Sequence, residues 1–263
     1  MMRPPFDPRP NIRLWSDSDG LAGYAWFEPP DYVLLEVRHG LGGHPDLIRE
    51  MLDWGYGRCE ESGAASLSTT VFSTDEARRA AVETNGFGLI AGRTGILYRR
   101  SLEAPIPEIS LPQGYLIRHA TAADLAERVA CHRDAWSVWG PSSYSEEAHR
   151  WLRATQEFDE TLDLVVEGPD GRFVSCCLVW ADEANAAGHF EPVGTRPAFS
   201  GRGFGRAMLF EGMRRLGERG LRAAYVATAG HNARARVLYP SVGFEQFETE
   251  LWYEKPAGEV KRG

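Results

Sequence analysis

The chain has 263 residues, of which 43 % are hydrophobic and 25 % are charged, and its formal net charge is −8. This composition is typical of a globular protein, and the length allows one large domain or two ordinary ones. The acidic balance argues against a general nucleic-acid binder, because such affinity comes largely from neutralised phosphates. No apolar run approaches the roughly 20 residues that span a bilayer, so we expect neither a nucleic-acid partner nor a membrane partner.

The first residues and the cysteines indicate the compartment. Residues 1–15 contain Arg and Pro but lack the apolar stretch of a secretory signal, so we expect a cytoplasmic protein. The four cysteines, Cys59, Cys131, Cys176 and Cys177, form no CxxC pair and have no His partner at metal-binding spacing. We therefore expect free thiols and no bound metal.

Three prolines and no helical periodicity in residues 101–114 indicate a boundary between two structured regions. We predict a first domain over residues 1–101, a linker over 102–112, a second domain over 113–256 and a tail over 257–263.

The two regions resemble each other at a fixed offset of 157 residues. Gly63 and Gly220 each close a helical run, a short apolar strand follows, and a further helical run ends 23 residues later at Gly86-Phe87 and Gly243-Phe244. Each Gly-Phe pair leads into a strand-like ending. Agreement in spacing, order and ending predicts a tandem repeat.

The second region predicts alternating strands and helices around a mixed sheet, an α/β layered fold. Thr121 and Asp124 are suited to the first turn of a helix, and Pro169, Asp170 and Gly171 are suited to a hairpin turn. The expected elements are a strand at 114–120, helices at 121–136 and 145–155, a hairpin at 162–182, a strand at 189–196 and a helix at 205–219.

A glycine-rich stretch, VGTRPAFSGRGFGRAM at residues 193–208, joins the last of these strands to the last helix. A strand, a glycine turn and a helix N-terminus present unpaired amides and a positive dipole end, which favour a phosphate or pyrophosphate. Arg206 stands where a GxGxxG dinucleotide loop needs glycine, and no GxxxxGK[ST] loop is present. The alternative is a flexible turn whose glycines serve packing.

This stretch resembles the acyl-CoA pyrophosphate loop of the GNAT (Gcn5-related) N-acetyltransferase superfamily. Residues 230–255 are similar to that superfamily's last helix, Gly-Phe turn and final strands, and residues 113–256 follow its whole element order. The tandem arrangement looks most like mycothiol synthase and related actinobacterial acetyltransferases. The resemblance implies tandem mixed sheets flanked by helices, with a truncated and degenerate first copy.

The resemblance also implies acetyl-CoA as cosubstrate. Ser200 departs from the Arg or Gln that usually opens the loop, but the backbone amides remain available. Val193 and Thr195 are implied to bind the pantetheine arm through strand backbone groups. Asn232 stands where the family has a cofactor-binding Asn, and its alternative role is that of a helix N-cap. The implied loop residues are Gly201, Arg202, Gly203, Phe204, Gly205 and Arg206.

Transfer of an acetyl group to an amine requires a neutral amine and a protonated leaving thiolate. Tyr239 matches the family's general acid, although a Tyr beside a Gly-Phe turn is also an ordinary core residue. His189 occupies the position where many members have a Glu base, and a neutral imidazole is able to accept a proton. Glu191 shares its strand face and is the second candidate. The alternatives are a solvent-facing His and a carboxylate paired with an Arg.

A covalent route through cysteine is disfavoured, since Cys176 and Cys177 lie in the middle of a strand with no His adjacent in sequence. The 157-residue offset places Asp46 at the position of Gly203 and Val82 at the position of Tyr239, so the first copy lacks the site chemistry. We therefore expect an N-acetyltransferase that acts by direct transfer on an amine of a small molecule or a peptide. The alternative is a noncatalytic acyl-CoA-binding regulatory module.

Overall fold

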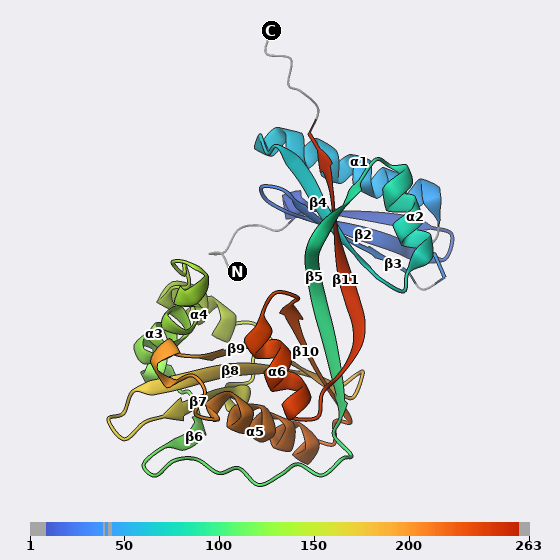
Figure 1. Cartoon of the computed structure of the whole chain (residues 1–263). Helices are drawn as coiled ribbons and strands as arrows, with labels where there is room; N and C mark the ends of the chain where they lie inside the picture. Colours follow the sequence, from blue (N-terminus) through green and yellow to red (C-terminus); the bar gives the residue numbers. More distant parts are fainter. Residues whose placement is uncertain (1–8, 39, 42–43, 258–263) are drawn as a thin grey trace. The chain divides into compact units, whose positions relative to one another are not determined.

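The computed structural model describes residues 9–38, 40–41 and 44–257, which form two compact units (Figure 1). Of these residues, Leu97–Thr228 and Asn232–Phe247 make up unit 1, and the remainder make up unit 2. The expected tail lies outside the described residues from position 258 onward. No helix in the described ranges is both long and apolar enough to cross a membrane.

Unit 1 is built on a mixed sheet. Strands β6 to β9 are antiparallel neighbours in chain order, and β10 runs parallel to β9. The elements are β6 (Leu116–His119), α3 (Leu125–Trp136), α4 (Glu146–Arg153), β7 (Asp163–Glu167), β8 (Phe173–Asp182), β9 (Ala187–Thr195), α5 (Phe204–Glu218), β10 (Ala223–Ala229) and α6 (Ala233–Ser241).

Local sequence signals account for the ends of several elements. Thr121 and Asp124 lie in the turn ahead of α3, as expected, and form a capping box in which the Thr121 amide donates to Asp124 Oδ2 at 2.8 Å. The hairpin between β7 and β8 turns at the expected residues, where the Gly171 amide donates to the Gly168 carbonyl at 2.9 Å. Residues 105–112, within the expected linker, contain no helix or strand.

Helices pack closely on both faces of the unit 1 sheet. A Cβ on Gly194 of β9 would lie 2.2 Å from the Trp136 ring of α3, so only glycine fits there. On the other face, Gly212 of α5 lies over the Phe190 ring, where a Cβ would come within 2.4 Å. Close packing on both faces fixes β9 between α3 and α5 (Figure 1).

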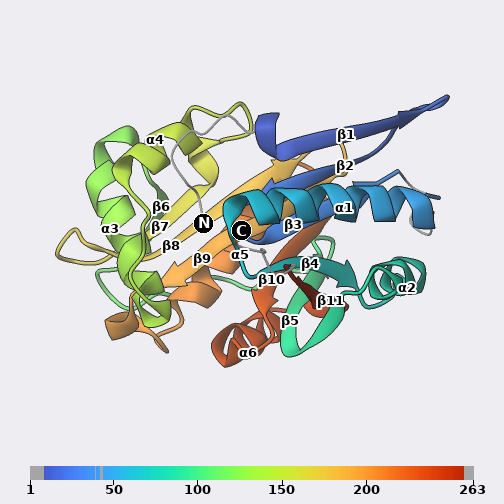
Figure 2. The same ribbon diagram turned by 90° about the horizontal axis from the view of Figure 1, so that it is seen from above.

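Unit 2 has its own hydrophobic core. Helix α1 contacts β2, β3 and β4 and lies along β2 and β3 in Figure 2. Its buried residues Ile48, Met51 and Leu52 pack with Phe27 and Val33. The elements are β1 (Ile12–Asp17), β2 (Gly20–Glu28), β3 (Tyr32–Val37), α1 (Pro45–Ser62), β4 (Ser66–Phe72) and α2 (Glu76–Thr84).

The two units do not follow chain order, because two long strands have residues in both. Strand β5 (Gly88–Ser101) leaves unit 2 at Ile96 and enters unit 1 at Leu97, and β11 (Glu245–Pro256) returns to unit 2 at Glu248. Within unit 2, β11 pairs antiparallel with β4, with Leu251 opposite Val71. Each copy of the repeat therefore gives part of its last strand to the other unit.

The internal repeat is visible in the helix ends. Asp75 caps α2 by accepting from the Arg78 amide at 3.0 Å, and Asn232 caps α6 by accepting from the Ala235 amide at 3.2 Å. Gly63 and Gly220, which end the preceding helices in the two copies, have φ of 73° and 78°. The element order α1–β4–α2–β5 in the first copy matches α5–β10–α6–β11 in the second.

Candidate active site

Strand β9 contains a bulge that changes the direction of its side chains. Cys177 of β8 lies opposite Val193 and Val179 lies opposite Phe190, so one residue of β8 faces both Glu191 and Pro192. The Trp180 indole of β8 donates to the Glu191 carbonyl at 2.9 Å and fixes the bulge. Bulges re-aim side chains beside many functional sites, and this one places Glu191 at a cavity.

That cavity lies between β9 and the α3–α4 region and has a volume of about 330 Å³. Its walls are mainly aromatic and contain one carboxylate among the described lining residues. We call it the aromatic pocket and define it by His132, Trp136, Trp139, Tyr144, Trp180 and Glu191.

His189 and Glu191 share one face of β9, as expected, since both side chains are exposed and Phe190 between them is buried. Both side chains keep contact with solvent, but the protein atoms around them exclude part of their water. This desolvation raises the pKa of Glu191 and lowers the pKa of His189, since it disfavours each charged form. Only Glu191 of the two is among the described residues that line the aromatic pocket. His189 instead lies opposite Trp180 and Tyr225 in the sheet.

Tyr239 lies near the end of α6 and is 6 % exposed. Its ring packs edge-on against Tyr98 at 5.6 Å and near Phe244 at 6.0 Å between centroids. Burial, and next the negative charge of Glu191, raise the pKa of Tyr239 above its ordinary value. The phenol therefore keeps its proton over the physiological range and lies within electrostatic reach of the Glu191 carboxylate.

The glycine loop, residues 200–206, ends in the first turn of α5. Gly203 is the N-cap, and its φ of 86° lies in the left-handed region that favours glycine. No side chain caps this helix, and the amides of Phe204, Gly205 and Arg206 have no acceptor within the described part of the chain. The Phe204 ring is 1 % exposed and packs on Tyr115, so this residue contributes only its amide to the loop.

The loop, the end of β9 and α6 meet at Gly205. A Cβ on Gly205 would lie 3.2 Å from Leu238 Cδ2 and 3.8 Å from Thr195 Oγ1. Pairing between β9 and β10 runs from Ala187 to Phe190 and, among the described residues, no further. The β9 segment that contains Val193 and Thr195 is therefore paired with β8 but not with β10.

The remaining predicted cofactor residues lie around this junction. Asn232 serves as a helix cap, and its Nδ2 also donates to Thr228 Oγ1 at 3.1 Å. Arg202 and Arg206 are exposed, and the Arg202 guanidinium lies 5.2 Å from the centre of the Phe199 ring. Two exposed cations thus border the unpaired amides at the start of α5.

Comparison with known proteins finds one family over part of the chain. Residues 127–244 match the family model described as the acetyltransferase (GNAT) family. This segment is therefore similar to a GNAT acetyltransferase domain. The chain is 28 % identical over 264 residues to a mycothiol acetyltransferase of Nocardia farcinica, covering 94 % of this chain and 84 % of that relative.

Solved structures of the GNAT class share the fold. A GCN5-related N-acetyltransferase from Sphaerobacter thermophilus aligns with a TM-score of 0.74 at 21 % identity, over 94 % of this chain and 81 % of that one. A tandem GNAT protein from the clavulanic acid biosynthesis pathway aligns with a TM-score of 0.72 at 13 % identity, over 97 % of this chain and 86 % of that one. These likenesses confirm the expected tandem mixed sheets flanked by helices.

Sequence reasoning did not identify the residues that form the wall of the aromatic pocket. Trp136, Trp139 and Tyr144 come from the end of α3 and the segment that follows it. A signal was present, because three large aromatic residues fall within nine positions that begin at the last residue of the first expected helix and end just before the second. Such a cluster outside a periodic pattern indicates a cavity wall.

A buried polar network lies behind this wall. Arg128 is 1 % exposed and donates from Nε to Asp163 Oδ1 at 2.8 Å. His149 Nε2 lies 3.5 Å from the second Asp163 oxygen, and His149 Nδ1 is 2.8 Å from the Tyr144 hydroxyl. Burial lowers the pKa of His149 to about 3, so its ring is neutral. The network holds the Tyr144 ring in the pocket wall.

Arg128→Met is expected to lower the free energy of unfolding by about 3–5 kcal/mol, because Asp163 loses the partner of its buried charge. Urea unfolding followed by circular dichroism measures the change. Arg133→Met on the exposed side of the same helix is the matched control and should cost less than about 0.5 kcal/mol. A loss below about 1 kcal/mol for Arg128→Met would show that the pair contributes little.

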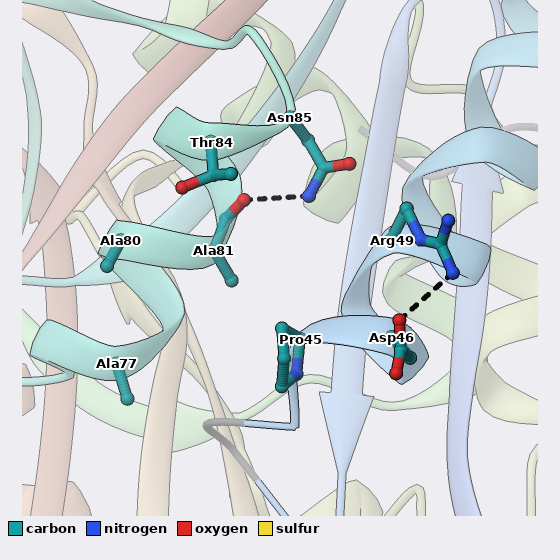
Figure 3. A pocket seen from close by; sticks show the side chains of 8 residues that line it. All are labelled: Pro45, Asp46, Arg49, Ala77, Ala80, Ala81, Thr84 and Asn85. Atoms are coloured by element: carbon teal, nitrogen blue, oxygen red, sulfur yellow. Dashed lines mark hydrogen bonds and ion pairs between the residues drawn. The ribbon is translucent and has the colours of Figure 1, made fainter.

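A second cavity, of about 510 Å³, lies in unit 2 between α1 and α2 (Figure 3). It occupies the position that corresponds, at the 157-residue offset, to the junction of α5 and α6. Four residues of α2 line this cavity: Ala77, Ala80, Ala81 and Thr84. Asp46, which stands in the place of Gly203, forms an ion pair with Arg49 at 3.0 Å. Val82, in the place of Tyr239, is fully buried. The carboxylate and the missing phenol agree with the expected loss of the site chemistry in this copy.

Within the described ranges, no cluster of three or more His, Cys, Asp or Glu side chains has an arrangement that could hold a metal ion. Cys176 and Cys177 are both fully buried free thiols.

Proposed function

We propose that the chain transfers an acetyl group from acetyl-CoA to a primary amine by direct transfer in a ternary complex. One observation carries this proposal: at Gly205 the glycine loop meets α6, which contains Tyr239, and the part of β9 that is unpaired with β10. The loop offers anion-binding amides, the strand offers free backbone groups, and the carboxylate and phenol offer a base and an acid.

The residues at the loop fit acetyl-CoA. The amides of Gly203 to Arg206 and the positive end of the α5 dipole suit the pyrophosphate, with Arg202 and Arg206 as additional cations. The backbone groups of Val193 and Thr195 suit the amide groups of the pantetheine arm, which would add to the sheet as a strand does. The second Nδ2 hydrogen of Asn232 remains available after its bond to Thr228.

The proposed reaction needs two proton transfers at named atoms. When bound, acetyl-CoA supplies the acetyl group as a thioester. The Glu191 carboxylate removes the proton from the amine nitrogen as the nitrogen–carbon bond forms, and its raised pKa makes it a better base than an ordinary Glu. The Tyr239 phenol donates its proton to sulfur as the carbon–sulfur bond breaks, which leaves an amide and free CoA. His189, on the same strand face, is the second candidate for the base.

A covalent intermediate on cysteine is not needed. Cys176 and Cys177 are fully buried, so neither sulfur has the solvent access that an acyl acceptor requires. The buried free thiols also agree with the cytoplasmic setting that we propose.

The acceptor is proposed to be an amine of a small molecule rather than of a peptide. The Nocardia farcinica relative is named for mycothiol and not for a protein or peptide, and the volume of the aromatic pocket lies near the lower end of the about 300–1,000 Å³ usual for ligand pockets.

Gly205→Leu is expected to weaken acetyl-CoA binding by at least about tenfold, because its side chain would fill the junction between Thr195 and Leu238. Calorimetric titration with acetyl-CoA measures the affinity. Gly217→Leu, an exposed change near the far end of the same helix, should leave the affinity within about twofold. Equal affinity in the wild type and both variants would place the cofactor elsewhere and defeat the proposal.

A further inference from the structure

The aromatic pocket limits the chemistry of the acceptor, an argument that rests on the proposed function. The described residues that line it include three tryptophans, a tyrosine, a leucine and two prolines. Only His132, Ser142 and Glu191 among them have mainly polar side chains. A cavity of this composition solvates an apolar group far better than a group with many hydroxyls.

Two of the polar atoms on the aromatic rings are already bonded within the protein. The Tyr144 hydroxyl lies 2.8 Å from the buried His149 Nδ1, and the Trp180 indole donates to the Glu191 carbonyl. These two residues therefore present ring faces and edges to the cavity, while their hydrogen-bonding groups are engaged elsewhere. A polyhydroxylated acceptor would lose hydrogen bonds to water that these walls do not replace.

The charge in the pocket is localised at the strand. The Glu191 carboxylate is the one acidic group among the described lining residues, and the Trp136 and Trp139 rings come from the end of α3 and the segment after it. A positive amine is attracted both by the carboxylate and by the faces of aromatic rings. The His132 ring also lines the cavity, where it stacks on the Trp136 ring at 4.2 Å between centroids.

We propose that the acceptor is a small arylalkylamine, whose amino group binds at Glu191 and whose aromatic ring stacks among Trp136, Trp139 and Tyr144. Trp139 is 58 % exposed at the edge of the cavity, so it is a specificity residue that can be changed without disturbing the core. Trp136, in contrast, stacks on His132 at 4.2 Å and packs against the core beneath it.

The test is calorimetric titration of the full chain with 2-phenylethylamine and with D-glucosamine, two primary amines that differ in hydroxyl content. We expect 2-phenylethylamine to bind at least about tenfold more tightly. Trp139→Ala should weaken that binding by about fivefold or more and leave glucosamine binding within about twofold. Trp151→Ala is the matched control, since Trp151 is 52 % exposed on α4 and is not among the described lining residues.

Tighter binding of glucosamine, or equal effects of the Trp139 and Trp151 substitutions, would overturn the inference. Acetylation assays with the same two amines separate it from the proposed function. Selective binding of 2-phenylethylamine without acetylation of either amine would contradict the proposed function and leave the chemistry of the pocket intact. Acetylation of glucosamine with a higher kcat/KM than that of 2-phenylethylamine would contradict the inferred acceptor and support the proposed function.

Discussion

Glu191→Gln is expected to lower kcat/KM by about 10²–10⁴-fold, the usual contribution of a general base. Glutamine keeps the size of the side chain and the bulge held by Trp180, but it does not accept the amine proton. Affinity for acetyl-CoA should stay within about twofold, because the glycine loop is unchanged. Steady-state assays of CoA release, combined with calorimetry, separate the two quantities.

The control for this prediction is His189→Asn on the same face of β9. It should cost less than about tenfold, because His189 is not among the described residues lining the aromatic pocket. A large loss of kcat/KM in His189→Asn, together with near-normal kcat/KM in Glu191→Gln, would show that His189 is the general base.

The pH profile supplies a second test of the base. Burial raises the pKa of Glu191 above its ordinary value of 4.5, and the base works in its deprotonated form. Activity carried by Glu191 should therefore be present above that raised pKa and decline as the pH falls through it. An acidic limb at or below 4.5 would contradict the assignment. The limb should disappear in Glu191→Gln.

Tyr239→Phe is expected to lower kcat by about 10²–10⁴-fold with little change in acetyl-CoA affinity, because only the proton donor is lost. The ring stays in place between Tyr98 and Phe244, so the packing is conserved. Burial and the charge of Glu191 raise the Tyr239 pKa above 10, so its acid form should persist throughout the neutral range. Single-turnover measurement of acetyl transfer isolates this step.

Tyr98→Phe is the matched control for Tyr239→Phe, since the two rings are in contact and both are buried. It should retain kcat within about threefold. Equal losses in the two variants would indicate a packing effect. Full activity in Tyr239→Phe would require another proton donor for the leaving thiolate.

The sequence predicted those parts of the fold that depend on neighbouring residues. The hairpin around Gly171, the capping box of Thr121 and Asp124 and the glycine turn before α5 are local features, and each lies where expected. The exchange of strand ends between units was not predicted. It depends on which sheet the ends of β5 and β11 join, and alternation along a strand carries no information on its distant partner.

The candidate site was predictable to a similar extent. Alternation placed His189 and Glu191 on one face but left the choice between them open. Glu191 lines the aromatic pocket next to a bulge, whereas His189 does not line it. The bulge is a property of the pairing between β8 and β9, so the sequence of β9 alone does not show it. The walls contributed by Trp136 and Trp139 likewise depend on how α3 packs against the sheet.

The central claim is that acetyl-CoA and an amine react directly in one site. The most direct test is to measure CoA release with and without 2-phenylethylamine, to identify the product by mass spectrometry and to record the intact mass of the protein after incubation with acetyl-CoA alone. Direct transfer predicts amine-dependent CoA release, an N-acetylated product and an unmodified protein. CoA release without the amine, together with an acetyl group on the protein, would contradict it.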